Sequence, residues 1–329
     1  MIKLSAFCKS ALLTLAIALG SRGQGIALLV PAYFDPASGY WNQLAASAQR
    51  VPVVAIANVF NGPGNSTART DYVQAMQSVR DAGGQVIGYV YSQYGARAPD
   101  VVKADMLRWH QLYPLDGFFV DEMANAPNTG LFDYYAGLVA YARSLKPQYL
   151  VVGNPGANTE EAYRIRNTAD VLTIFEGDSS YTNFVPSSWT QKYPPYQFAH
   201  LIYGIATANS MQTNLNLAIS RRAGFVYITD DVLSNPWDRL PTYWAEEVAQ
   251  VESINRAAAR QILTNLTIRT TGQSATVTSQ GATGLYVLEA GFPGQWTPIA
   301  TNLTATGAID WTITNVTIPP NRIFRTRQP

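Results

Sequence analysis

Cysteine is nearly absent from this 329-residue chain, and charged residues are few. The only cysteine is Cys8, so no disulfide can form within the chain, and its stability has to come from a large apolar core. Hydrophobic residues make up 47% of the sequence, which is too apolar for a disordered chain. There is no run of basic residues and no interleaving of Arg or Lys with aromatic residues, so we expect no nucleic-acid partner.

Histidine is also scarce, with His110 and His200 as the only two. Metal sites of the amidohydrolase type need clustered His and carboxylate ligands, and two isolated histidines argue against one. We interpret each histidine as structural. We therefore expect no metal and no other cofactor.

The N-terminus has the pattern of a secretory signal peptide. Lys3 and Lys9 give it a positive start, and the apolar stretch 11–20 is too short to span a bilayer comfortably. Small residues up to Gly23 offer cleavage points, and no later apolar run has membrane length. We expect residues 1–23 to be removed, leaving a monomer in the periplasm or the extracellular space with no membrane contact.

Between residues 26 and 258 a short apolar run, a turn and a helical stretch follow one another repeatedly. The eight apolar runs are 27–31, 53–58, 86–91, 117–121, 149–153, 171–176, 198–203 and 225–230. Their almost continuous apolar character is typical of parallel strands that are buried on both faces. Helical patterns are clearest at 71–82, 100–110, 131–145, 211–223 and 243–255.

Eight such units match the length of a (β/α)8 TIM barrel, about 250 residues, so the predicted fold class is α/β with this barrel at residues 24–260. A doubly wound sheet is the alternative, but no Gly-rich dinucleotide or phosphate loop follows the first strand. From residue 261 to 329 helical periodicity gives way to short alternating runs rich in Thr, Asn and Gly. These runs predict a small, all-β, sandwich-like C-terminal domain.

A TIM barrel builds its active site at the C-terminal ends of its strands. No lysine ends a predicted strand, so Schiff-base chemistry lacks its nucleophile. The strand ends carry carboxylates, amides and tyrosines instead. As candidates for binding a substrate we take Tyr33, Asp35, Asn58, Tyr91, Asn154, Tyr203 and Asp230.

Asp121 and Glu176 end the fourth and sixth predicted strands, which point to the same mouth of the barrel with one strand between them. Glycoside hydrolysis uses two carboxyl groups, one protonated and one ionised. A carboxyl at the end of an apolar strand is partly desolvated, which raises its pKa as a general acid requires. Side chains alternate along a strand, so Glu122 points away from the mouth and supports its neighbours unless the chain turns after Asp121.

A structural role is the alternative for each of these residues. An acid at the top of a barrel strand often caps the next helix or pairs with an arginine. Each of the tyrosines is as compatible with the core as with a substrate platform. Two acids at the ends of the fourth and sixth strands, in a site without cations, favour the catalytic interpretation.

Six short motifs resemble the spherulation-specific (spherulin-4-like) family, glycoside hydrolase family 135, which is related to families 114 and 166. They are VPAYFDP (30–36), NVFNGPG (58–64), GYVY (88–91), GFFVDE (117–122), NPG (154–156) and FEG (175–177). The resemblance implies endo-hydrolysis of an exopolysaccharide of α-1,4-linked galactosamine or N-acetylgalactosamine. It implies functional acids at Asp121, Glu122 and Glu176, with Asp121 as nucleophile or stabilising carboxylate and Glu176 as acid/base.

Two other functions remain open at this point. One is a non-catalytic carbohydrate-binding or matrix protein that uses the barrel as a scaffold. The other is a hydrolase of a different glycan, which an uncharged aromatic cleft would favour over a cleft rich in Asp and Glu. A retaining, an inverting and a substrate-assisted mechanism are all compatible with the sequence.

Overall fold

The computed structural model describes residues 25–262 and the backbone of six strands between residues 266 and 327, with side chains described for residues 25–258. The predicted signal peptide, residues 1–23, lies outside the described residues. Within the described part of the chain, no helix combines the length and apolar character needed to cross a membrane.

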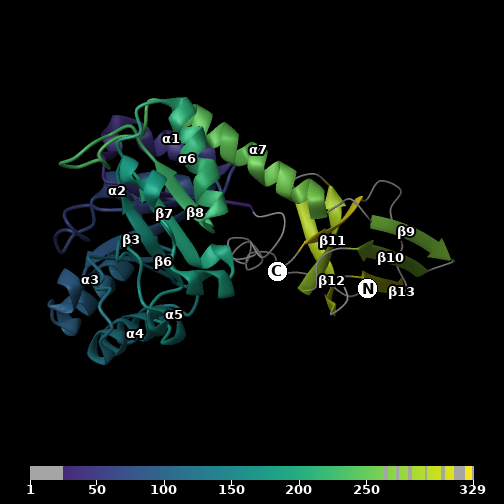
Figure 1. The fold of residues 1–329 in the computed structure, drawn as a ribbon, viewed down its shortest axis with the longest axis horizontal. Coiled ribbons are helices and arrows are strands. Elements are labelled where there is room, and N and C mark those ends of the chain that lie inside the picture. The colour runs from purple at the N-terminus through teal and green to yellow at the C-terminus, as the bar shows by residue number, and fades with distance from the viewer. Residues whose placement is uncertain are drawn as a thin grey trace. The chain divides into compact units, whose positions relative to one another are not determined.

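Eight parallel strands form a closed barrel (Figure 1). They follow one another in the order of the chain, and β8 pairs with β1. Their bounds are β1 Ala27–Ala32, β2 Val53–Ala57, β3 Gln85–Tyr91, β4 Gly117–Asp121, β5 Leu150–Gly153, β6 Val171–Gly177, β7 Phe198–Ile202 and β8 Phe225–Ile228. Nearly all strand residues are buried, because the barrel wall is covered from inside and from outside. The predicted (β/α)8 fold and its eight strands are confirmed.

Helices follow most of the strands and surround the barrel (Figure 1). The α-helices of the described residues are α1 Tyr40–Ala48, α2 Thr70–Asp81, α3 Pro99–Leu112, α4 Thr129–Leu145, α5 Glu161–Ile165, α6 Ala208–Ser220 and α7 Trp244–Ile262. All five segments with a clear helical pattern are helices. The segment after β6 differs from the expected repeat, because it forms only short 3-10 turns. Prolines 186, 194 and 195 lie in it and lack the amide hydrogen that an α-helix needs.

Two glycines allow the site-bearing strands to pack closely. A Cβ atom on Gly117, the first residue of β4, would lie 1.9 Å from the carbonyl oxygen of Leu150 in β5. A Cβ atom on Gly88 in β3 would lie 2.7 Å from the ring of Trp109 in α3. That ring donates a hydrogen bond of 2.8 Å to the carbonyl oxygen of Tyr89. The close packing holds β3, β4 and β5 in fixed positions relative to one another.

The chain divides into two compact units, and the barrel unit comprises Ile26–Ser253. The predicted domain boundary after residue 260 falls within α7, which runs on into the second unit. Six strands follow: β9 Leu266–Thr271, β10 Ser274–Gln280, β11 Gly284–Phe292, β12 Gln295–Thr304, β13 Ala308–Thr314 and β14 Ile323–Arg327. They form two antiparallel three-stranded sheets, ordered β13-β10-β9 and β12-β11-β14, as expected for a β-rich C-terminal region.

We expect Gly117→Ala to destabilise the barrel by about 3 kcal/mol, because the new methyl group would overlap backbone that cannot move aside. Gly137→Ala is the matched control, since Gly137 lies in α4 with nothing within 4 Å of the added atom. That variant should gain about 0.5–1 kcal/mol from helix propensity. Chemical denaturation of both variants measures the difference. Equal stability of the two would contradict the tight β4–β5 contact.

Candidate active site

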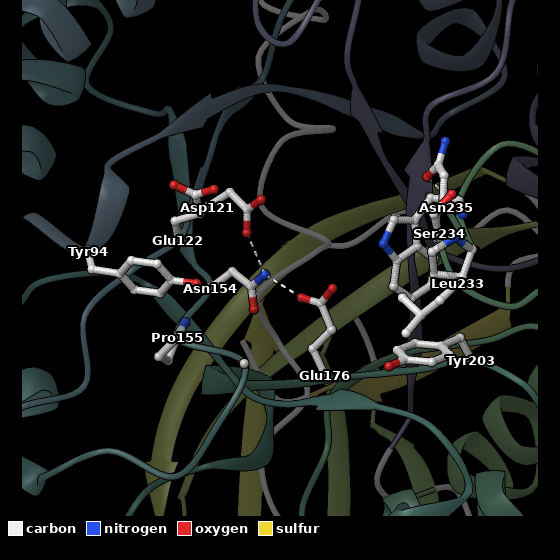
Figure 2. Close-up of a pocket in the computed structure, with 13 residues that line it drawn as sticks. Tyr94, Asp121, Glu122, Asn154, Pro155, Glu176, Tyr203, Leu233, Ser234 and Asn235 are labelled. Carbon is white, nitrogen blue, oxygen red and sulfur yellow. Dashed lines mark hydrogen bonds between the residues drawn. The ribbon is translucent and has the colours of Figure 1, made fainter. Parts of the chain in front are cut away.

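The ends of β4, β5 and β6 bring three polar side chains together at the mouth of the barrel (Figure 2). Asp121 is the last residue of β4, Asn154 directly follows β5, and Glu176 is the second-to-last residue of β6. β5 lies between β4 and β6 in the barrel, which places Asn154 between the two acids. The predicted meeting of Asp121 and Glu176 at one mouth is what the structure shows.

A single nitrogen atom of Asn154 joins the two carboxyl groups. Its Nδ2 donates to Asp121 Oδ1 at 2.7 Å and to Glu176 Oε2 at 2.5 Å, so these two oxygens are at most the sum of the two lengths, about 5.2 Å, apart. The opposite orientation of the amide would set its oxygen against two acidic oxygens. The bridge therefore fixes the amide, and it leaves Asn154 Oδ1 buried without a hydrogen-bond partner.

The acids open onto a cavity of about 430 Å³ (Figure 2). Its walls carry the carboxylates Asp121, Glu122 and Glu176, the aromatic residues Tyr94, Tyr203 and Trp237, and residues 154–156 and 233–236. No Lys, Arg or His belongs to this lining. The cavity is therefore acidic and partly aromatic, a surface suited to sugar rings and to cationic groups.

The chain turns immediately after Asp121, and this turn brings Glu122 into the same cavity. Glu122 has a φ of 49°, in the left-handed region that non-glycine residues seldom adopt. The strict strand alternation, which would have pointed Glu122 away from the mouth, ends at this residue. Both acids of the Asp-Glu pair line the cavity.

Buried Ser92 and Tyr135 hold this turn in place. The Ser92 amide donates to the carbonyl oxygen of Asp121 at 2.9 Å, and its hydroxyl donates to that of Glu122 at 2.7 Å. The Ser92 oxygen also lies 2.9 Å from the Tyr135 hydroxyl, which accepts from the Ala124 amide at 2.8 Å. All the hydrogens of this network can be placed without conflict. The two hydroxyls thus tie the loop after β3, the loop after β4 and helix α4 together.

The surroundings of Asp121 and Glu176 favour different protonation states for the two acids. Burial and the negative charge of Asp121 raise the pKa of Glu176 to about 7, despite hydrogen bonds from Asn154 and Trp237. Burial also raises the pKa of Asp121, but the Glu122 amide, Asn154 and Tyr89 donate hydrogen bonds that favour its ionised form. At neutral pH the pair therefore suits an ionised Asp121 and a Glu176 that holds a proton for much of the time.

Of the seven predicted substrate-binding residues, Asn154 and Tyr203 line the cavity. Tyr33 lies close by, edge-on to Tyr89 at 5.6 Å, and the charges of Asp121 and Glu176 help to raise its pKa after burial. Tyr91 lies under the guanidinium group of Arg97, 4.1 Å from ring centre to carbon. Neither Tyr33 nor Tyr91 is among the residues that line the cavity.

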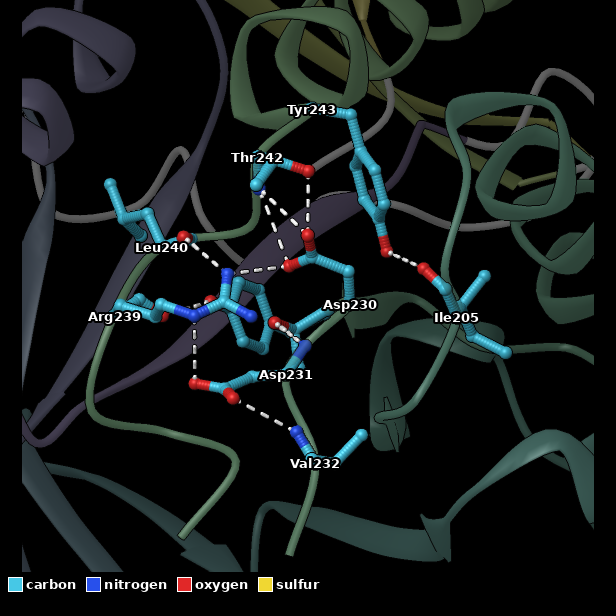
Figure 3. A network of polar contacts seen from close by, with 10 residues as sticks. Ile205, Asp230, Asp231, Val232, Arg239, Leu240, Thr242 and Tyr243 are labelled. Carbon is cyan, nitrogen blue, oxygen red and sulfur yellow. Dashed lines mark hydrogen bonds and ion pairs between the residues drawn. The ribbon is translucent and has the colours of Figure 1, made fainter.

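The structure does not bring Asp35, Asn58 or Asp230 to the cavity. Asp35 accepts from the Ala37 amide at 2.9 Å, and Asn58 from the Gly62 amide at 2.9 Å, so each stabilises its own loop. Asp230 accepts from Arg239 at 2.7 Å and from the Thr242 hydroxyl at 2.5 Å (Figure 3). These are the capping and ion-pair roles that were the structural alternative for acids at strand ends.

Sequence reasoning missed Tyr94, Trp237 and residues 233–236 of the lining. Tyr94 comes three residues after the end of β3, and Trp237 nine residues after the end of β8. A search of the strand ends alone stops short of both. The sequence feature that could have identified them is an aromatic residue in the loop beyond a barrel strand, with Tyr94 next to Gly95 and Trp237 next to Pro236.

Both histidines are hydrogen-bonded to tyrosine hydroxyls, His110 to Tyr149 and His200 to Tyr181, each at 2.7 Å. Burial lowers the pKa of His200 to about 3, so it is neutral inside the barrel wall. Among the described residues, no group of three or more His, Cys, Asp or Glu side chains is arranged to hold a metal ion.

Comparison with known proteins adds a family and a fold. The model of spherulation-specific family 4 matches residues 27–251. Spherulin-4 of Physarum polycephalum is 28% identical over 247 residues, 71% of this chain and 73% of that protein. Sph3 of Aspergillus clavatus, solved in complex with GalNAc, has a TM-score of 0.61 at 21% identity, over 69% of this chain and 98% of that one.

An α-amylase from Anoxybacillus, described as a glycosyl hydrolase, has a TM-score of 0.50 at 10% identity, over 93% of this chain and 98% of that one. At these identities the two solved structures bear on the fold alone. They agree with the closed eight-stranded topology that the barrel is a TIM barrel.

We expect Glu176→Gln to stabilise the fold at neutral and higher pH. The carboxyl ionises near its ordinary pKa of 4.5 in the unfolded chain and near 7 in the fold, so the wild type loses stability as pH rises through that window. Glutamine does not titrate, so its advantage should grow from zero below about pH 4.5 to about 3 kcal/mol above about pH 7. Denaturation curves at a series of pH values measure it.

Asp100→Asn is the control, because that carboxyl is 97% exposed. It should show no comparable growth in stability with pH. A stability difference between Glu176→Gln and wild type that stays constant across the pH series would mean that this carboxyl ionises at the same pH in the folded and the unfolded chain, which would contradict its raised pKa.

Proposed function

Since this chain belongs to spherulation-specific family 4, we propose that it is a glycoside hydrolase that cleaves an amino-sugar polymer with Asp121 and Glu176 as its paired carboxylates. The observation that supports this most is the Asn154 bridge, which holds two half-buried acids, suited to different protonation states, beside one cavity. Export through the predicted signal peptide would bring the enzyme, as a monomer, to an exopolysaccharide outside the cytoplasm.

The short distance between the acids favours a retaining mechanism. Retaining glycosidases hold their carboxyl groups about 5–5.5 Å apart, and inverting enzymes need about 6.5–9.5 Å to admit a water molecule. The bound of about 5.2 Å between Asp121 Oδ1 and Glu176 Oε2 fits the first class. A carboxylate that close to the acid can reach the anomeric carbon itself.

In the first step Glu176 donates its proton to the glycosidic oxygen while the Asp121 carboxylate attacks the anomeric carbon, so that the bond to the leaving sugar breaks and an ester to Asp121 forms. Glu176 is now ionised. In the second step it takes a proton from a water molecule, whose oxygen displaces Asp121 from the sugar. Both carboxyls return to their starting protonation states, as this mechanism requires.

The charge of the cavity supports an amino sugar as substrate. Three carboxylates and no basic side chain line it, which favours a protonated amine over an anionic or purely neutral glycan. The family resemblance implies α-1,4-linked galactosamine or N-acetylgalactosamine, and Sph3 was solved with GalNAc. We therefore propose endo-cleavage of an α-1,4-linked, partly deacetylated galactosaminoglycan.

Asp121→Asn and Glu176→Gln are each expected to lower the release of oligosaccharides from such a polymer by at least about a hundredfold. Asp35→Asn is the matched control, because it changes an acid near the mouth that lies outside the cavity lining, and it should retain activity. In the wild type, NMR should show that the first product keeps the anomeric configuration of the substrate. Inversion would exclude Asp121 as nucleophile, and products from both variants would exclude the carboxylate mechanism.

Glu122→Gln should weaken binding of the cationic, deacetylated polymer and leave the fully acetylated polymer almost unaffected. Removing one of three carboxylates from the cavity should raise KM for the deacetylated form by about two- to fivefold. It should also flatten the dependence of KM on salt concentration. Cleavage of the fully deacetylated polymer by the wild type would further exclude assistance by an N-acetyl group. An equal change in KM for both polymers would mean that Glu122 does not recognise the amine.

A further inference from the structure

We propose that Tyr94 is a stacking platform for a sugar unit of the bound polymer, on the opposite side of the catalytic pair from Tyr203 and Trp237. The ligand is a pyranose ring, whose apolar face would lie on the phenol ring. The proposal rests on the proposed function for the identity of the polymer. The contacts below give Tyr94 a role separate from that of the two acids.

The first observation is the exposure of the ring. Tyr94 is 65% exposed although it lines the cavity, whereas Tyr89 and Tyr135, on neighbouring elements of the barrel, are 6% and 1% exposed. A single exposed aromatic residue needs no explanation by itself. An exposed aromatic ring that stabilises no core and lies at a substrate cavity has the form of a binding surface.

The second observation is the backbone that presents the ring. Gln93 and Tyr94 have φ values of 51° and 55°, so two consecutive non-glycine residues are in the left-handed region. Each such residue costs roughly 1–2 kcal/mol. Tyr94 is 65% exposed, so its burial offsets little of that cost. Strain of this kind is concentrated at functional sites, where the surrounding structure imposes it.

The surrounding structure holds this turn against the catalytic strand. The Tyr94 amide donates to the carbonyl oxygen of Glu122 at 2.7 Å. On its other side, a Cβ atom on Gly95, with a φ of 85°, would lie 2.5 Å from Leu131 in α4. The turn is therefore clamped between the loop after β4 and helix α4. Tyr94 has a fixed position relative to Asp121, which directly precedes Glu122.

The third observation is the order of residues across the cavity. Figure 2 shows Tyr94 on one side of the Asp121–Asn154–Glu176 group and Tyr203 with Leu233 on the other. Tyr203 packs edge-on to Trp237 at 5.9 Å, which gives that side an aromatic wall. Aromatic surfaces on both sides of the acids fit a chain that passes across them and continues in both directions. An enzyme that removed single terminal sugars would need only one.

The test separates the platform from catalysis. In an otherwise wild-type protein, Tyr94→Ala should raise KM for the long polymer by about tenfold with kcat unchanged, and the effect should shrink as size-fractionated substrates become shorter. Tyr94→Phe keeps the ring and should restore wild-type KM. Ile165→Ala is the matched control, since Ile165 is a 66% exposed apolar residue at the end of α5, just before the chain enters β6 at the other end of the barrel.

Binding in a protein without turnover gives the second measurement. Glu176→Gln should bind the deacetylated galactosaminoglycan in calorimetry, and adding Tyr94→Ala should weaken that binding by about tenfold. This result supports the platform even if the wild type releases no products, in which case the proposed hydrolysis fails alone. Unchanged KM and unchanged binding in the alanine variants would overturn the platform, as would an equal loss on short and long substrates. Absence of binding by Glu176→Gln itself would overturn the platform together with the proposed glycan.

Discussion

The site at the mouth of this barrel depends on one amide nitrogen that is shared by two half-buried carboxyl groups. Asn154 Nδ2 contacts Asp121 and Glu176 at 2.7 and 2.5 Å, and it is the only amide that does so among the described contacts. Two carboxylates so close in a poorly solvated site cannot both ionise readily. The bridge keeps them close, as the proposed hydrolysis requires, and burial together with repulsion from Asp121 raises the pKa of Glu176 so that it holds a proton near neutral pH.

The barrel strands fix the positions of Asp121, Asn154 and Glu176, and the loops beyond the strands complete the cavity beside them. Neighbouring parallel strands set Asn154 between the acids, and the packing at Gly117 and Gly88 leaves these strands little freedom. The turns after β3 and β4 are locked to each other through Ser92. The Tyr94 amide also donates to the carbonyl oxygen of Glu122, so the turn that places Glu122 in the cavity also holds the backbone of the proposed sugar platform.

Strand periodicity was enough to predict most of the fold and the pair of acids at the centre of the site. The runs that end in Asp121 and Glu176 predicted both the closed barrel and the meeting of these acids, because parallel strands share one C-terminal edge. Periodicity could not reveal the turn at Glu122, which breaks the alternation on which the prediction rested. Periodicity also could not distinguish Asp230, whose carboxylate is paired with Arg239, from Asp121. Nor could it identify Trp237, which lies in a loop whose path is set by tertiary contacts.

The most direct test of the coupled pair is the titration of Glu176 itself, followed by NMR of glutamate labelled with 13C at the carboxyl carbon. We expect the Glu176 carboxyl to titrate near pH 7 in the wild type. In Asp121→Asn, which removes the neighbouring charge but keeps its shape, that same carboxyl should titrate at lower pH. A Glu176 carboxyl that titrates near 4.5 in the wild type, or that is unmoved by Asp121→Asn, would contradict the account.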